Sequence, residues 1–213
     1  MNKKSKLKRV PKRGVYDRKE IYKILDNNIT CHIAFVHNGI PVSIPTTYGR
    51  YEDTIYIHGA SVSRMLQEME KGIDVCISIA KVTAMILSRS AFHHSANYES
   101  VVIFGKGRLV TNDTEKLLGL KTLTNNFLKD RWNEVREPNQ KELNATKVIA
   151  ISMDEISGKR REEGVDDHKD DIDLPIWAGI IPVNETYGLP IKAPNLNAKI
   201  PLSKSVQNLK ISN

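Results

Sequence analysis

Side chains suited to holding a phosphate, with a histidine beside them, lie close together in the stretch TIYIHGASVSRML, residues 54–66. His58 ends a run of β-branched and aromatic residues with the composition of a buried strand, and Ser63 and Arg64 follow the break at Gly59. The apolar residues after Arg64 recur at helical spacing. The start of a helix presents free backbone N–H groups, so a hydroxyl and a guanidinium there favour an anion. The stretch predicts a phosphate site with an imidazole beside it, although a capped surface helix has the same pattern.

Two further groups of polar residues could contribute to the same site. Thr46 and Thr47 end the preceding strand, and the segment 89–100 is dense in His, Ser, Asn and Tyr. If the two strands pair across the turn at residues 51–53, the threonines lie near the strand end that bears His58. The segment 89–100 separates two apolar runs, and a solvated loop is its simplest interpretation.

Other catalytic and metal-binding patterns are disfavoured by their spacing. Several serines lie near His93 and His94, but the chain has no G-x-S-x-G sequence, and proximity in sequence does not make a triad. The aspartates between 166 and 173 lack the glycine and spacing of a calcium loop, so a solvated acidic loop explains them better. Cys31 and Cys76 lie in apolar runs, which indicates buried free thiols in a reducing compartment and leaves too few ligands for zinc. No metal site is expected.

The positive charge of the chain is concentrated at its start. Of 213 residues, 32 are Lys or Arg and 25 are Asp or Glu, and residues 1–15 form a basic arm that holds much of the net charge of +7. No apolar run follows the arm, so it does not resemble a secretory signal, and no stretch is long enough to span a membrane. A nucleic-acid-binding protein is disfavoured because the arm lacks interleaved aromatic residues. We expect a cytoplasmic protein that binds neither nucleic acid nor membranes.

The rest of the pattern predicts a mainly β protein, an antiparallel barrel with peripheral helices. Helices are expected after Asp17, from Ser63 to about Lys71, and after a cap at Asp113 or Thr114. Strands are expected within 31–60 and at 75–80, 82–88, 100–110 and 145–153. The sequence FGKGR lacks the third glycine of a dinucleotide fingerprint.

The chain is expected to form one domain, residues 16–190. From Ser157 the sequence becomes highly charged, which predicts a surface loop that docks Trp177. Residues 191–213 are rich in Pro and Asn and should form an extended or partly disordered tail.

Taken in order, several motifs resemble the flavin-nucleotide-binding proteins related to pyridoxamine 5′-phosphate oxidase, in the branch that includes nitroimidazole-resistance proteins. The similarity runs from about Arg13 to Leu189. The motifs that carry it are YDRKEIYKILD, CHIAFV, GIPVSIPTTY, TIYIHGASVSRML, SRSAFHHSANYESVVIFG and LPIWAG. Their combination is specific to the family. One departure is Glu99, which stands where relatives usually carry Arg and puts substrate preference in doubt.

The resemblance implies a split β-barrel that forms a homodimer, with FMN held in grooves between the subunits. By matched position, Ser63 and Arg64 would bind the FMN phosphate. The flavin would be lined by Ile44, Pro45, Thr46, Thr47, His58 and Gly59, and by His94, Tyr98 and Ser100. Trp177 would close the groove from the partner chain.

Two functions follow from this resemblance. The first is an FMN-dependent oxidoreductase that passes electrons from NADH or NADPH through the flavin to a small-molecule substrate, with His58 as the catalytic donor to flavin or substrate. The second is a protein that binds flavin or haem without turnover, for storage or sensing. Colour and its loss on adding a reduced nicotinamide separate the two.

Overall fold

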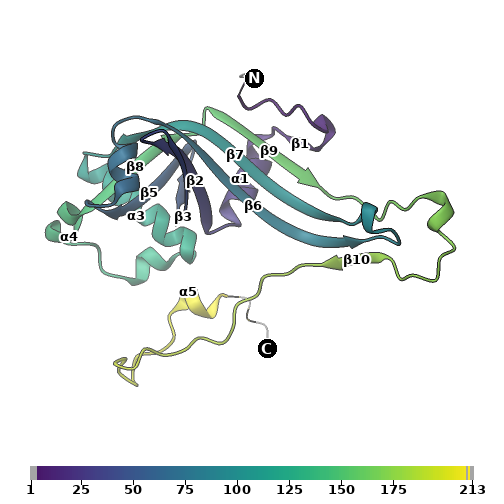
Figure 1. Ribbon diagram of the computed structural model, residues 1–213. Helices are drawn as coiled ribbons and strands as arrows, with labels where there is room; N and C mark the ends of the chain where they lie inside the picture. Colours follow the sequence, from purple (N-terminus) through teal and green to yellow (C-terminus); the bar gives the residue numbers. More distant parts are fainter. Residues whose placement is uncertain (1–3, 210, 212–213) are drawn as a thin grey trace.

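The computed structural model describes residues 4–209 and residue 211, and it shows a β-barrel that extends into a long arm (Figure 1). The arm, distinct from the basic N-terminal segment, comprises residues 82–100 and 161–183. The strands are β1 (Gly14–Val15), β2 (Thr30–His37), β3 (Ile40–Thr47), β4 (Gly49–Tyr51), β5 (Thr54–Ala60), β6 (Asp74–Leu87), β7 (Ser95–Leu109), β8 (Thr146–Ser152), β9 (Glu155–Arg161) and β10 (Gly179–Pro182). The helices are α1 (Arg18–Asp26), α2 (Arg64–Met69), α3 (Asp113–Phe127), α4 (Gln140–Ala145) and α5 (Lys204–Gln207). Short 3-10 turns complete the set: η1 (Pro11–Arg13), η2 (Ala91–His93), η3 (Arg131–Glu134) and η4 (Lys169–Asp171).

The ten strands form one antiparallel sheet with the main order β3-β2-β6-β7-β8-β5-β4. β9 pairs with β7 and β1, and β10 pairs with the outer end of β6. No helix among the described residues is long and apolar enough to cross a bilayer. The mainly β architecture with peripheral helices confirms the predicted fold class.

Tyr48 joins the two ends of this strand order. It lies between β3 and β4, is 1% exposed, and donates a hydrogen bond from its hydroxyl to the Leu25 carbonyl at 2.5 Å. β3 and β4 are the two ends of the main strand order, and the chain passes directly from one to the other at Tyr48. The barrel is therefore closed by the chain itself, because the ladder of the described strands does not include hydrogen bonds between β3 and β4. Gly49 lets α3 cross directly over β4, because a Cβ at Gly49 would lie 2.6 Å from the Leu123 nitrogen.

The sequence periodicity places the core correctly. In β2, Cys31, Ile33 and Phe35 are buried, and their neighbours face outward or are partly covered. Burial raises the pKa of the Cys31 thiol to about 12, as expected for an inert thiol. Cys76 is also free but only half buried, so the prediction of two buried thiols holds for Cys31 alone.

The predicted helices exist, with small changes at their ends. Asp17 caps α1 by accepting a hydrogen bond from the Glu20 nitrogen at 3.0 Å, as predicted. The cap of α3 is Asn112, one residue earlier than expected, and its side chain accepts from the Glu115 nitrogen at 3.1 Å. The helix expected from Ser63 to Lys71 is the six-residue α2.

The long arm corrects two predictions. The strands expected at 75–80 and 82–88 are one strand, β6, with an irregularity between Val82 and Ala84. The segment 89–100 is not a loop throughout. It contains the short 3-10 turn η2, and strand β7 already begins at Ser95.

The charged sequence after Ser157 differs from the prediction at its start. Residues 157–161 belong to strand β9, and Arg161 is 7% exposed, donating to the Asn97 side-chain oxygen at 2.7 Å and pairing with Glu163 at 3.2 Å. Residues 162–178 contain no strand and form a connection with the short turn η4, as expected. Trp177 is not buried against the barrel, since it is 66% exposed, and its ring lies beside Gly179.

Candidate functional site

His58 is the predicted catalytic residue, and it lies near the end of β5 opposite Val148 of β8. Its ring is half buried, and Nδ1 is buried without a hydrogen-bond partner among the described residues. Burial lowers the pKa of His58, so the imidazole is neutral at neutral pH. A neutral imidazole with a free ring nitrogen can form a hydrogen bond to a ligand or bind a metal ion.

Ser63 and Arg64 lie at the start of α2, as predicted. The Ser63 hydroxyl makes no capping hydrogen bond, and Arg64 is exposed without an ion-pair partner in the part of the chain that the structure describes. Because α2 has only six residues, its dipole contributes less than the sequence indicated. Anion binding here therefore depends on the guanidinium and the free hydroxyl. The helix folds back tightly on β5, since a Cβ at Gly59 would meet Leu66 Cδ1 at 3.0 Å.

Thr46 and Thr47 lie at the end of β3, but the predicted hairpin is made differently. β4, not β3, pairs with β5 across the turn at residues 51–53, and Gly49 opposite Tyr56 is the last pair of that ladder. The threonines pair with β2 instead, so they are not directly opposite His58. Along the same strand, Pro45 is exposed, and the other predicted lining residues, Ile44, Thr46 and Thr47, are half buried.

His94, Tyr98, Ser100 and Trp177 belong to the arm. The His94 Nδ1 lies 3.0 Å from the Ser90 carbonyl oxygen, and Ser100 donates from Oγ to the Lys159 carbonyl at 3.4 Å. Tyr98 lies between Val82 of β6 and Arg161 of β9. Trp177 follows η4 and precedes β10 at the outer end of the arm (Figure 1).

The predicted site residues therefore form two groups that one chain does not bring together. Gly107 of β7 lies against α2, because a Cβ there would be 2.5 Å from the Met69 carbonyl. Tyr98 is nine residues earlier on the same strand, about 30 Å away at roughly 3.3 Å per residue. Trp177 is farther still, because Gly179 pairs with Leu87 at the outer end of β6. The barrel group is His58, Ser63, Arg64 and the end of β3, and the arm group is His94, Tyr98, Ser100 and Trp177.

Two side-chain contacts beside the barrel group were not predicted. Lys147 of β8, opposite Gly59, pairs with Glu70 at 2.6 Å, and His37 lies 3.4 Å from Glu68. Glu68 also pairs with Lys71 at 2.6 Å, and its hydrogen bond from Lys71 is the main cause that lowers the pKa of the Glu68 carboxyl. Both pairs attach α2 to neighbouring strands. In the sequence these residues are only polar or charged side chains far apart in the chain. The strand register is needed to show that each pair is in contact.

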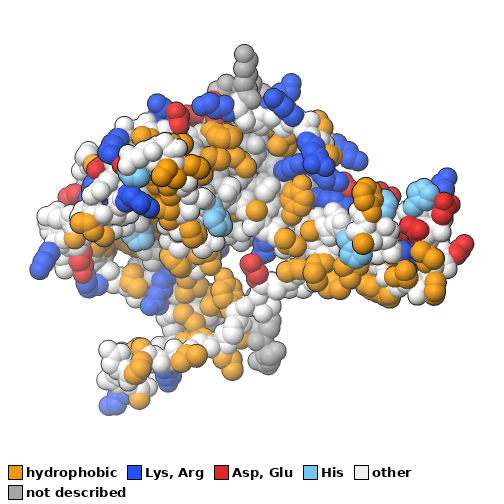
Figure 2. Space-filling view, viewed as in Figure 1, with side chains coloured by type: hydrophobic (Ala, Val, Ile, Leu, Met, Phe, Trp, Pro, Cys, Tyr) orange, Lys and Arg blue, Asp and Glu red, His pale blue; other side chains and the backbone are white. Residues whose placement is uncertain are grey.

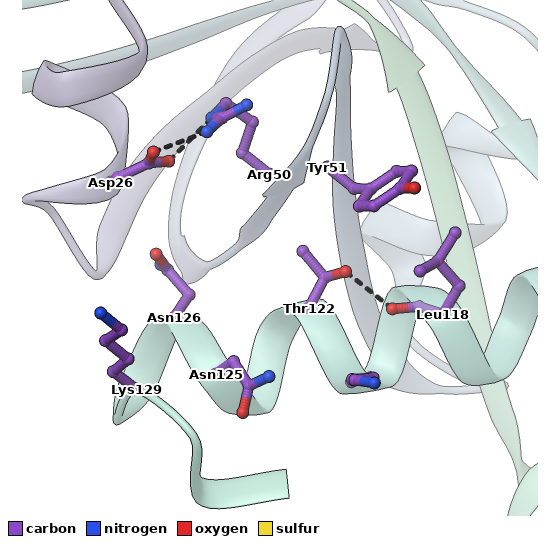
Figure 3. A pocket seen from close by; sticks show the side chains of 9 residues that line it. Asp26, Arg50, Tyr51, Leu118, Thr122, Asn125, Asn126 and Lys129 are labelled. Carbon is purple, nitrogen blue, oxygen red and sulfur yellow. Dashed lines mark hydrogen bonds and ion pairs between the residues drawn. The ribbon is translucent and has the colours of Figure 1, made fainter.

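A polar cavity of about 710 Å³ lies between β4 and α3, away from every predicted site residue (Figure 3). In it, the Arg50 guanidinium and the Asp26 carboxylate face each other at 2.6 Å, and Lys121 and Lys129 lie on α3. Nothing in this lining pairs a nucleophile with a base. Across the described residues, no group of three or more His, Cys, Asp or Glu side chains is arranged to hold a metal ion.

Comparisons with known proteins assign this architecture. The family model described as pyridoxamine 5′-phosphate oxidase matches residues 17–160. The chain belongs to the pyridoxamine 5′-phosphate oxidase family. This confirms the resemblance seen in the motifs, and with it the split-barrel fold. No match was found among curated protein sequences.

Among the solved structures that resemble this chain, two match it over nearly its full length and a third over a shorter part. A flavin adenine dinucleotide (FAD) and haem binding protein from Mycobacterium smegmatis is 32% identical, with a TM-score of 0.89, covering 93% of this chain and 97% of its own. The flavocytochrome Anf3 from Azotobacter vinelandii is 26% identical, with a TM-score of 0.90, covering 99% of this chain and 98% of its own. A protein assigned to 5-nitroimidazole antibiotic resistance, from Bacteroides thetaiotaomicron, is 22% identical, with a TM-score of 0.57, covering 70% of this chain and 90% of its own.

Proposed function

We propose that this protein is a flavin-binding oxidoreductase with haem as a second cofactor, taking electrons from NADH or NADPH. The extent of the structural match supports this. The two relatives named for flavin and haem, or as a flavocytochrome, cover 93% and 99% of the chain, whereas the relative assigned to nitroimidazole resistance covers 70%. The two matches over nearly the full chain therefore favour the proteins named for flavin and haem, or as a flavocytochrome, as guides to function.

The flavin phosphate is assigned to Ser63 and Arg64. Both present unpaired donors, and a guanidinium forms strong charge-assisted hydrogen bonds to phosphate. FMN is the flavin that the family resemblance implies, and FAD is the one named for the relative from Mycobacterium smegmatis. Bound flavin would supply hydride and single-electron transfer, and haem iron a single-electron acceptor.

His58 is the residue that we assign to the haem iron. Its imidazole is neutral because burial lowers its pKa, and the buried Nδ1 lacks a partner among the described residues. Metal binding requires a neutral imidazole, and His58 is already in that protonation state at neutral pH. The prediction that His58 donates to flavin or substrate concerns the same position, and haem iron is the specific partner proposed here.

A homodimer would bring the two groups of site residues together. Along β7 in one chain, Ser100 is about 23 Å and Tyr98 about 30 Å from the contact between Gly107 and α2, at roughly 3.3 Å per residue. Two-fold pairing places the same patch of each copy on the other, so the arm of one copy could complete the barrel site of its partner. Trp177, Tyr98 and Ser100 would then contact the cofactor bound to the partner subunit.

The visible spectrum of the purified protein tests this function. Flavin and haem absorbance together are expected, with bleaching of the flavin on addition of NADH or NADPH. His58→Ala should remove the haem absorbance and keep the flavin, whereas His168→Ala, an exposed histidine beside Asp170, should change neither. Flavin that no nicotinamide reduces would make the protein a binding module. Protein that can be loaded with neither cofactor would rule the proposal out.

A further inference from the structure

The segment after β10 leaves the body of the molecule and returns to it only at α5 (Figure 1). Before the excursion, Val183 donates to the Thr83 carbonyl at 2.9 Å and Lys81 pairs with Glu185 at 2.8 Å. After it, the Glu134 carboxylate accepts hydrogen bonds from the Ser205 nitrogen at 3.0 Å and from its hydroxyl. We call the intervening residues 188–202 the C-terminal loop.

The C-terminal loop is held mainly by bonds within itself. Its backbone hydrogen bonds join Leu196 to Ala193 and Ile200 to Asn197, each at 3.0 Å. No backbone hydrogen bond to the barrel is present among the described residues of the loop. Its contacts with the rest of the described chain are few: Gln207 Nε2 donates to the Leu202 carbonyl, and the loop lies against η3.

The loop is apolar despite its exposure. Ile191 is 97% exposed and Leu189 71%, and about half of each of Ile200 and Leu202 is exposed. Apolar side chains are seen along the loop at the lower edge of the molecule and, separately, along the underside of the arm (Figure 2). The loop also walls a hollow of about 560 Å³ against η3, lined largely by its own Ile, Leu and Pro residues. A monomer in water rarely keeps such a surface uncovered.

We infer that the C-terminal loop packs against a second copy of this chain. From Ile172 to Leu202, the exposed large apolar residues together present on the order of 1,000 Å², close to the roughly 800 Å² that each partner buries in a standard complex. The inference rests on the proposed function, in which each cofactor site needs residues from two chains. In that assembly a second copy would lie beside the arm, and it would cover the exposed apolar side chains of the arm and those of the loop.

The test replaces apolar side chains of the loop in the full-length protein. Leu189→Asp combined with Ile191→Asp should raise the dimer dissociation constant about tenfold or more, because charge would enter a buried contact. Sedimentation across a dilution series measures it. Both side chains are largely exposed within one chain, so circular dichroism should show an unchanged fold. Asn195→Asp, which adds charge at an exposed polar position of the same loop, is the matched control and should not shift the constant.

Flavin content measured in the same samples separates this inference from the proposed function. A wild-type protein that is monomeric throughout, or a double variant that dimerises like the wild type, overturns the loop assignment. If the variant remains dimeric and keeps its flavin, the proposed function stands without the loop. If the wild type dimerises through the loop but cannot be loaded with flavin, the loop assignment stands and the proposed function fails.

Discussion

Arg64 and His58 have complementary electrostatic roles at the two ends of the segment between β5 and α2. The Arg64 side chain is exposed to solvent, so its guanidinium is accessible to a phosphate. Burial lowers the pKa of His58 and so keeps it neutral, and its buried Nδ1 has no hydrogen-bond partner among the described residues. The cation would set cofactor affinity and the imidazole would set cofactor chemistry.

Replacing Arg64 by Ala should weaken flavin binding by roughly 10- to 100-fold, because a charge-assisted hydrogen bond is worth about 1.5–3 kcal/mol. Fluorescence titration of the apoprotein with FMN and FAD measures this. Lys121→Ala removes an exposed cation from the cavity between β4 and α3 and serves as the control. Equal affinity in wild type and Arg64→Ala would refute the phosphate assignment.

The lowered pKa of His58 predicts a stability difference at acidic pH. Below about pH 6.5 the unfolded chain protonates this histidine, whereas the folded protein resists protonation until its lower pKa is reached. The unfolded state then binds more protons, so stability falls as pH falls through this window. His58→Gln removes this contribution, and urea unfolding of both proteins on either side of pH 6.5 should show the smaller loss in the variant. Parallel pH profiles would show that burial of His58 does not matter to folding.

At the level of elements, close backbone packing fixes the position of α2. β7 passes under the end of this helix at Gly107, with no room for a side chain. The ion pair of Glu70 with Lys147, just after the helix, and the contact of Glu68 with His37 attach the helix on two other sides. The start of α2, and with it Arg64, is thereby held on the barrel.

Gly107→Ala should destabilise the protein by about 1–3 kcal/mol, because its Cβ would lie 2.5 Å from the Met69 carbonyl and overpack the contact. The free energy of unfolding from urea titration measures it. Gly164→Ala is the control, since a Cβ there meets nothing within 4 Å. A loss no larger than that of the control would mean that α2 shifts freely, and flavin affinity should then change as well.

The sequence predicts the elements whose burial follows a simple period. β2, β5 and β8 alternate or run apolar, and α1 repeats its apolar residues at helical spacing, so their positions were expected. β9 was missed because its inward residues include Ser157 and Gly158, which carry no hydrophobic signal. The start of β7 was missed for a related reason. Its buried polar residue, Asn97, is satisfied by Arg161, a partner 64 residues away.

The candidate site was predicted in part. The stretch 54–66 identifies its strand, turn and helix because all three are consecutive in sequence. The distance between the barrel group and the arm group was not predictable. It depends on β6 and β7 being continuous long strands, whereas the polar composition of 89–100 indicated a loop.

At the scale of the whole molecule, the proposed site would belong to an assembly of two chains. In that proposal the barrel of one chain would supply the phosphate and imidazole contacts, and the arm of the partner, with its aromatic Trp177, would complete the site. Cofactor affinity should then depend on the assembly as well as on local contacts.

Flavin should consequently dissociate when the protein is diluted below its dimerisation constant, because each site would lose the arm of its partner. Flavin fluorescence and sedimentation, followed over the same dilution series, should change together. Trp177→Ala should weaken flavin binding, whereas Phe92→Ala, another exposed aromatic at the end of the arm, provides the comparison. Flavin that stays bound to a monomer would contradict the shared site.

The pairing of β10 with β6 has a consequence for biosynthesis. Ala84 of β6 pairs with Pro182, which is almost a hundred residues later in the chain. At about 5–20 residues per second, a ribosome needs several seconds or more to synthesise the intervening residues. During that time the outer edge of β6 is an open template for another nascent strand. Crowded translation should therefore be the condition under which this protein aggregates most readily, and chaperones that shield strand edges should raise its yield.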